Sequence, residues 1–245
     1  MVFTPDDKAL IAEFGDDDFR NSVKAFELPS LKEKWTITAP TPLTTAEPRV
    51  CSPDSRIVFG ALHTWPQKKD AHRKWDDVTS RNVAWDTATG QELWSLSLAK
   101  GESSSAPAFS PDGRVLVGMS RQKDQTKAIF IDTTIGKVTH STPLPNFRWA
   151  DPAFSPDGRW VAILTREIPK GIRNGTPPDE APQPRVHLIE TATGVVREVI
   201  VLPHAYTNHV AFSPDGKTLA TDGYGRVLLW DMTTPPGELK SNVVP

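Results

Sequence analysis

The feature that most constrains this chain is a short string that recurs along its whole length. Phe-Ser-Pro-Asp-Gly occurs at residues 109–113, 154–158 and 212–216, and weaker copies read CSPDS at 51–55 and FTPDD at 3–7. Counted from the serine or threonine of each copy, successive copies are 48, 58, 45 and 58 residues apart. Because a period of this size marks a tandem array of one supersecondary unit, we expect five repeats.

A second string follows in each unit, namely an apolar run that ends in an acid and is followed by a turn. It reads VAWDTATG at 83–90, AIFIDTTIG at 128–136, VHLIETATG at 186–194 and VLLWDMTTPPG at 227–237, with a weaker VKAFELPSL at 23–31. From each acid to the next serine the spacing is 23 to 25 residues, whereas from serine to acid it ranges from 18 to 35. The length variation therefore falls between the two strings of a unit.

Both strings have the chemistry of tight turns between strands. Proline presets φ for a type I turn, Asp tolerates the next position, and Gly takes the positive φ that closes a hairpin. The segments that follow, such as RVLVGMS after Gly113 and RWVAILT after Gly158, are short and rich in β-branched or apolar residues. With 23 prolines in 245 residues, the chain is expected to be all-β.

These residues resemble the WD40 or PD40 class of β-propeller repeats. The resemblance rests on SPDG followed by a strand, then an apolar run ending in Trp-Asp at 85–86 and 230–231, then a T-x-T-G turn. It covers nearly the whole chain and implies one propeller domain over 1–245, with about five four-stranded blades around a central channel. In the family's lettering of strands a to d, SPDG then lies at the a–b turn, the acidic string at the c–d turn, and the variable stretch at the b–c loop.

The resemblance is incomplete in two respects. Only two of the five acids follow a tryptophan, and the position of the family's tetrad Asp falls on Tyr224, while His204 follows Pro203 in place of Gly. We therefore expect the family's hydrogen-bonded tetrad to be absent and the blades to depend on apolar packing. The first repeat begins close to Met1, so its innermost strand is expected to be short. The chain is then either a closed five-bladed ring or part of a larger or incompletely closed propeller.

Composition narrows the classes of function. A formal net charge of -2 argues against a dedicated nucleic-acid binder. Cys51 is the single cysteine, which excludes an internal disulfide and a multi-cysteine zinc site. It stands at a Phe position of the repeat and is expected to be a buried thiol. Because no basic leader precedes an apolar run and no long apolar stretch occurs, we expect a cytoplasmic protein with no membrane partner.

The b–c loop of the second repeat is the candidate binding site. Long excursions at one face of a propeller form its default binding surface. This loop combines two indoles with several cations that could hold an acidic partner by charge and stacking; the alternative is a solubilising loop whose tryptophans pack on the blade. The candidate residues are Trp65, Lys68, Lys69, His72, Arg73, Lys74 and Trp75.

Other motifs give weaker indications of a docking, metal or catalytic site. The proline-rich stretch 167–185 is read as a solvated loop, with docking to a polyproline reader as the alternative. The three aspartates within 15–21 lack the spacing of a calcium loop, and His204 and His209 lack a spacing for joint metal ligation. No G-x-S-x-G nucleophile motif occurs. We therefore expect no metal, no cofactor and no catalytic residue.

Two functions remain open. The first is a non-catalytic scaffold that binds a protein or peptide partner through the b–c loop face, as the resemblance implies, and an acidic partner is one option. The second is a propeller enzyme of the lactonase or quinoprotein kind, with a metal or cofactor in the central channel. The fold hosts both kinds of protein, so a convergence of three or more Asp, Glu, Asn or His side chains at the channel is the feature that would separate them.

Overall fold

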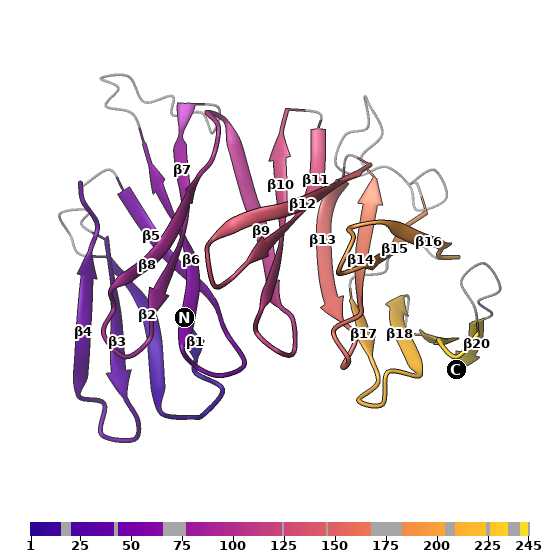
Figure 1. Cartoon of the computed structure of the whole chain (residues 1–245), viewed down its shortest axis with the longest axis horizontal. Coiled ribbons are helices and arrows are strands. Elements are labelled where there is room, and N and C mark those ends of the chain that lie inside the picture. The colour runs from indigo at the N-terminus through magenta and orange to yellow at the C-terminus, as the bar shows by residue number, and fades with distance from the viewer. Residues whose placement is uncertain are drawn as a thin grey trace. The chain divides into compact units, whose positions relative to one another are not determined.

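The computed structural model describes residues 1–15, 21–41, 44–65, 77–123, 125–145, 147–167, 183–203, 209–223, 226–234 and 241–244. They form five four-stranded sheets, each made of four consecutive strands in chain order (Figure 1). The prediction of an all-β chain of five four-stranded repeats is confirmed. Within the described ranges, no helix has the length and apolar character needed to cross a bilayer.

The strands of the five sheets have the following bounds. The first sheet contains β1 (Val2–Phe3), β2 (Ala9–Gly15), β3 (Asn21–Glu27) and β4 (Glu33–Thr38). The second contains β5 (Thr44–Cys51), β6 (Ile57–Thr64), β7 (Thr79–Asp86) and β8 (Glu92–Ser97). The third contains β9 (Glu102–Phe109), β10 (Val115–Gln122), β11 (Gln125–Asp132) and β12 (Lys137–Leu144). The fourth contains β13 (Phe147–Phe154), β14 (Trp160–Glu167), β15 (Arg185–Glu190) and β16 (Val196–Val201), and the fifth β17 (Val210–Phe212), β18 (Thr218–Gly223), β19 (Arg226–Asp231) and β20 (Ser241–Val244). The short innermost strand expected at the start of the chain is β1, with two residues.

The S-P-D string forms the turn between the first and second strands of every sheet. In the third sheet, Ser110 Oγ donates to Asp112 Oδ1 at 2.7 Å and accepts the backbone N–H of Val115 at 2.9 Å. The bond from Ser110, together with one from the backbone N–H of Arg114, holds the pKa of the Asp112 carboxyl below its usual value. Gly113 has φ of 72°, a left-handed conformation that favours glycine. The predicted turn chemistry is confirmed.

The acidic string forms the turn between the third and fourth strands. Asp86 Oδ1 accepts the backbone N–H groups of Ala88 and Thr89 at 3.0 and 2.8 Å, and Gly90 N donates to Asp86 O at 2.8 Å with φ of 73°. A side chain that bonds the backbone in this way ends a strand and starts a hairpin. This explains why an acid followed by a Gly four residues later recurs in the sequence.

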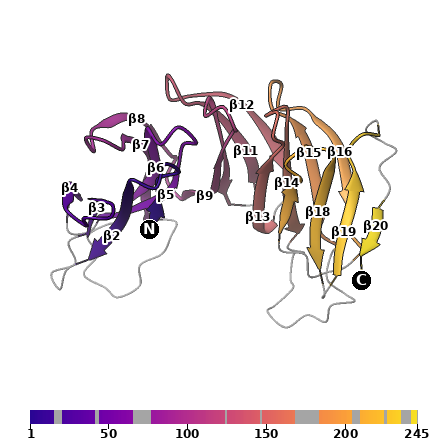
Figure 2. The ribbon, with the colours of Figure 1, turned by 90° about the horizontal axis from the view of Figure 1, so that it is seen from below.

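The contacts divide the chain into two compact units, one of residues 1–116, 120–123 and 131–137, the other of 117–119, 124–130 and 138–245. In the first unit, Ile11, Val23 and Ala25 of the first sheet pack against a face of the second sheet that includes Val58 and Trp85. The second unit has a corresponding core between its fourth and fifth sheets, whose strands are seen side by side in Figure 2. The single domain over 1–245 stays a prediction.

The fifth sheet contains one buried polar bond between side chains, and the expected absence of the whole tetrad stays a prediction. In the fifth sheet, Trp230 Nε1 donates to Thr221 Oγ1 at 3.2 Å, and both side chains are buried. This Trp–Thr bond joins the third strand to the second and is a polar link that the sequence analysis did not expect. It was missed because threonine is also a common strand residue, so its sequence position alone does not mark a partner. Tyr224 and His204 lie outside the described residues.

Candidate functional site

The two ends of a sheet differ in the lengths of the connections between its strands. With the four strands of a sheet lettered a to d in chain order, every a–b connection has five residues, whereas the b–c connection has two in the third and fifth sheets, five in the first, 14 in the second and 17 in the fourth. We call the end of a sheet from which the b–c connection leaves its b–c end. The b–c connection varies most, as predicted, whereas the c–d connection has four to nine residues and the connection between successive sheets two to eight.

The binding loop predicted from the sequence is described only at its start. Trp65 follows β6 directly and is half-buried. The other six predicted residues lie outside the described residues, so the site stays a prediction; they are Lys68, Lys69, His72, Arg73, Lys74 and Trp75. Most of the proline-rich stretch, the three aspartates after Gly15, and His204 are also outside the described residues.

A polar cluster lies at the b–c end of the second sheet, on strands β5 to β7 and on β9 of the third sheet, and its histidine and two serines are buried. His63 Nδ1 is 2.8 Å from Ser80 Oγ, and His63 Nε2 is 3.3 Å from Arg49 Nη2. The same Arg49 nitrogen donates to Glu47 Oε2 at 3.2 Å, and Arg49 Nη1 donates to Ser104 O at 2.8 Å. We call these five residues the polar cluster. Sequence analysis did not find it, because its members are 2 to 55 positions apart.

The hydrogen bonds of the cluster determine the protonation of His63. A guanidinium only donates, so His63 Nε2 accepts from Arg49 and Nδ1 carries the proton that is donated to Ser80 Oγ. Burial lowers the pKa of His63, with Glu47 acting to raise it and Arg49 to lower it further. His63 is therefore neutral at pH 7 and bonded at both nitrogens. Because Ser80 accepts the imidazole proton, His63 does not activate it as a nucleophile.

Acidic side chains near the cluster do not form a metal site. Burial raises the pKa of Glu13 on β2, and repulsion from Glu47 adds to this effect. Glu47 Oε2 lies 3.9 Å from His63 Nε2, but the Arg49 guanidinium occupies the space beside both groups. Among the residues that the structure describes, no group of three or more His, Cys, Asp or Glu is arranged to hold a metal ion.

Cys51 is buried, as predicted. Its side chain packs in the core between the first and second sheets. Burial raises the pKa of the thiol to about 11, with the charge of Asp6 adding to the shift. A thiol with this pKa is not ionised at neutral pH and is a poor nucleophile.

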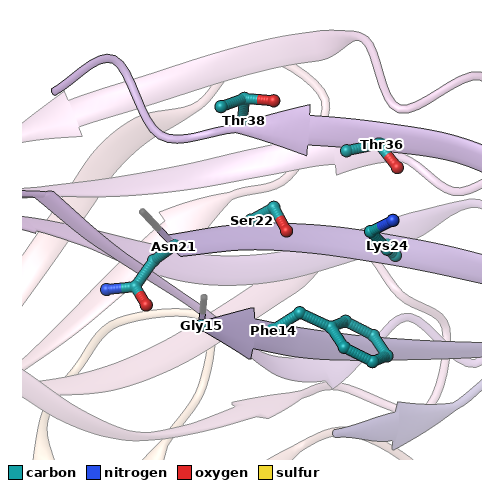
Figure 3. Close-up of a pocket in the computed structure, with 7 residues that line it drawn as sticks. All are labelled: Phe14, Gly15, Asn21, Ser22, Lys24, Thr36 and Thr38. Carbon is teal, nitrogen blue, oxygen red and sulfur yellow. The ribbon is translucent and has the colours of Figure 1, made fainter. Parts of the chain in front are cut away.

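A shallow groove of about 380 Å³ crosses three strands of the first sheet. Figure 3 shows the ring of Phe14 on β2 near Lys24 and Ser22 of β3 and Thr36 of β4. Lys24 Nζ is already paired with Glu33 Oε2 at 3.0 Å, and the other polar groups are hydroxyls and an amide spread along the strands. The groove therefore offers little charge or convergence to a specific ligand.

One segment of the sequence matches a family model. Residues 197–231 match the WD40 model, described as WD domain, G-beta repeat. The chain contains a WD40 repeat. The match runs from β16 to the end of β19 and so includes the fifth SPDG string and the fifth acidic string as far as Asp231. No curated protein matches the sequence.

Solved structures similar to this chain confirm the propeller fold. A structure described as the Dos1 propeller is 15% identical, with a TM-score of 0.61 over 96% of this chain and 55% of that one. An oligogalacturonate lyase in complex with manganese is 16% identical, with a TM-score of 0.60 over 97% of this chain and 62% of that one. A eukaryotic initiation factor is 15% identical, with a TM-score of 0.60 over 97% and 53%.

These likenesses concern the fold alone, because the identities are low. This chain spans between half and two thirds of the length of each of the three solved chains. The five sheets match propeller blades, so the fold expected from the resemblance is confirmed.

Proposed function

We propose that this WD40-repeat chain is a non-catalytic module that binds a protein or peptide partner through the b–c ends of its blades. The observation that carries the proposal is the difference in length variation between the a–b and the b–c connections. The a–b connection has five residues in all five blades, while the b–c connection varies from two to 17. Loops that differ in length on a constant scaffold are typical of a recognition surface.

The described polar side chains also support binding in preference to catalysis. In the polar cluster, Arg49 bonds Glu47, His63 and the backbone of Ser104, and His63 donates to Ser80. These groups satisfy one another. A catalytic acid, base or nucleophile needs a free reactive atom at the substrate, and the cluster offers none.

A propeller enzyme with a metal or cofactor at the channel is the second candidate. One observation favours it: Glu13, Glu47 and His63 lie near one another in the first unit, and one similar solved propeller is a lyase in complex with manganese. The positive charge of Arg49 beside Glu47 and His63 opposes a cation there. The interaction module is therefore the better supported proposal.

The test uses two matched variants of the full chain. In the first, Lys68, Lys69, Arg73 and Lys74 of the second b–c loop are all replaced by Ala. In the second, four exposed cations next to a–b and c–d turns are replaced by Ala, namely Lys8, Arg56, Arg114 and Lys137. A partner captured from the source cell is purified and titrated against each protein. We expect only the loop variant to lose affinity, by tenfold or more, with an unchanged Tm. Equal affinity of all three proteins would overturn the proposed site.

A further inference from the structure

The outer strand of the fourth blade, β16, exposes a row of apolar side chains. Val199 and Val201 on β16 and Val195 just before it are 44, 49 and 44% exposed, and all of β16 belongs to the second compact unit. Among the other outer strands with described side chains, β4 exposes no large apolar side chain, β8 exposes Leu93 and β12 exposes Val138. β16 is therefore the most apolar of these outer strands.

The free edge of β16 also presents backbone hydrogen-bonding groups. β16 is the last strand of its sheet, and within the described ranges it pairs with β15 alone. Leu202 N donates to Pro184 O at 2.9 Å, and residues of an antiparallel pair alternate between those that bond the partner strand and those that do not. Ile200 therefore points its N–H and C=O toward β15, whereas Val199 and Val201 point theirs outward. The same two valines thus expose both their side chains and their backbone groups.

β16 contains no lysine and no proline, the residues that commonly prevent an edge strand from pairing with another chain. The edge strands β4 and β12 do contain them, as Lys34, Lys137 and Pro143. The one cation of β16 is already neutralised, because Arg197 Nη2 lies 2.6 Å from Glu190 Oε2. The edge of β16 is therefore open to a further strand.

We infer that β16 pairs edge to edge with β16 of a second copy of this chain, antiparallel and about a two-fold axis at Ile200. This arrangement places Val199 opposite the second copy's Val201, so that their outward N–H and C=O groups bond each other. It places Glu198 opposite Leu202, and no like charges meet. An axis at Glu198 would instead bring two glutamates together, which destabilises a strand pair.

A second copy fits this edge because the edge is complementary to itself, as a two-fold contact requires. A foreign strand would gain the same backbone bonds, but the exposed valines and the paired Arg197 give the edge no charge with which to select a foreign sequence. Pairing of two short edges buries less than the roughly 1,200 Å² typical of stable association, so the dimer is weak and reversible. This self-association goes beyond the proposed function and does not use the b–c loops.

The test measures the mass of the full chain by sedimentation velocity between 2 and 200 µM. Two double variants change the edge, namely Val199→Lys with Val201→Lys and Val199→Glu with Val201→Glu. The control, Leu93→Lys with Val138→Lys, adds two charges to the outer strands of the second and third blades. We expect wild type and control to dimerise within twofold of each other. Each edge variant alone should dimerise at least tenfold more weakly, because like charges then meet across the pair.

An equimolar mixture of the two edge variants should dimerise again, because lysine then faces glutamate, and this rescue would show that both variants are folded. Hydrogen exchange at 2 and 200 µM locates the contact, since the amides of Val199 and Val201 in wild type should exchange more slowly at the higher concentration. A wild type that stays monomeric, an edge variant that dimerises like wild type, a mixture that stays monomeric, or protection confined to another strand would each overturn the inference.

Two further arms separate the alternatives. A monomeric wild type whose β16 amides become protected by an added peptide of alternating threonine and valine would assign the edge to a foreign strand and overturn the inference. The four-alanine loop variant should dimerise like wild type. A failure of the proposed loop site and a failure of the β16 contact are therefore seen in different variants.

Discussion

At the scale of single residues, the turns show where this sequence departs from its own repeat. The c–d turns of the second, third and fourth blades place Gly90, Gly136 and Gly194 at φ between 64 and 73°. In the first blade the same position is Leu31, with φ of 56° and a side chain that is 62% exposed. A left-handed conformation costs a non-glycine residue about 1–2 kcal/mol. The first blade therefore keeps a strained turn.

Leu31→Gly should relieve this strain. We expect the free energy of unfolding to rise by up to about 1 kcal/mol, because the gain at positive φ exceeds the extra chain entropy that glycine loses on folding. Urea denaturation measures the change. Leu31→Ala is the control, since it removes the exposed side chain but keeps Cβ, and it should give no gain. A gain of equal size in both variants would show that the exposed leucine side chain is the cause.

A second residue-scale prediction concerns two equivalent threonines. Thr133 Oγ1 donates to Gly113 O at 2.7 Å, whereas the buried Thr191 Oγ1 has no hydrogen-bond partner among the described residues. Thr133→Val should lower the free energy of unfolding by about 1 kcal/mol, the usual net value of one hydrogen bond. Thr191→Val should be neutral or stabilising, because it removes an unsatisfied buried hydroxyl. Chemical denaturation of both variants measures these changes. A larger loss in the free energy of unfolding for Thr191→Val than for Thr133→Val would refute this account.

At the scale of elements, a repeated contact joins the d strands of the first three blades to the c–d turn of the next blade. Trp35 Nε1 donates to Thr87 O at 2.9 Å, and Trp94 Nε1 donates to Thr133 O at 2.7 Å. In the following pair, His140 takes the tryptophan position, with Nε2 3.0 Å from Thr191 O. Each ring lies on the glycine of the turn, where a Cβ would come within 2.4 to 2.8 Å of ring atoms.

Gly136→Ala tests this packing. The new Cβ would stand 2.4 Å from Trp94 Cγ, whereas at Gly113, with a similar φ, the nearest atom is Pro53 Cδ at 3.7 Å. Gly113→Ala therefore reports backbone strain alone, about 1–2 kcal/mol. We expect Gly136→Ala to cost about 1–3 kcal/mol more, the usual range for overpacking. Equal losses in urea denaturation would show that the tryptophan moves aside without cost.

His187 on β15 makes the stability of the fourth blade depend on pH. Burial lowers its pKa from 6.5 to about 4, and Arg185 adds to the shift. As the pH falls from 6.5, the unfolded chain takes up a proton at this site and the folded chain does not. The free energy of unfolding should therefore decrease between pH 6.5 and about 4, by up to about 1.4 kcal/mol per pH unit.

The measurement compares denaturation at several pH values between 4.5 and 7. His187→Gln should show a shallower decrease than wild type over this window. His209→Gln is the control, because His209 is exposed, and it should keep the slope of wild type. A His187→Gln protein with the slope of wild type would mean that other groups cause the pH dependence.

At the scale of the whole molecule, the two ends of the blades differ in how their polar groups are used. In the a–b and c–d turns, polar side chains form hydrogen bonds within their own repeat unit. Examples are the bonds of Ser110 with Asp112 and of Thr89 with Asp86. Their polar groups are thus committed to structure. The b–c ends carry the connections that vary most in length, so recognition is expected there.

Metal analysis of the whole chain gives the last prediction. Because Arg49 places a positive charge 3.2 Å from Glu47 and 3.3 Å from His63, we expect no stoichiometric calcium, manganese or zinc after dialysis into each metal. Elemental analysis of the purified protein measures this. A stoichiometric metal that is lost in Glu47→Gln would favour the enzyme candidate.

The sequence by itself determined the repeat, the five four-stranded blades and the chemistry of both turns. These follow from local rules, because Pro, Asp and Gly act on the φ and ψ of their own few residues. It also marked the b–c connection as the variable one. The candidate loop residues after Trp65 lie outside the described residues, so for them the sequence remains the source of the prediction.

Only the tertiary structure decided which polar side chains meet. Arg49 bonds Ser104 across 55 residues, Trp35 bonds Thr87 across 52, and His63 bonds Ser80 between strands. Such partners depend on how neighbouring sheets pack and on register, and a serine or histidine in a strand pattern carries no mark of its distant partner. Hydrogen bonds between these buried groups form only when the blades pack together. The tertiary structure is therefore needed to identify the partners.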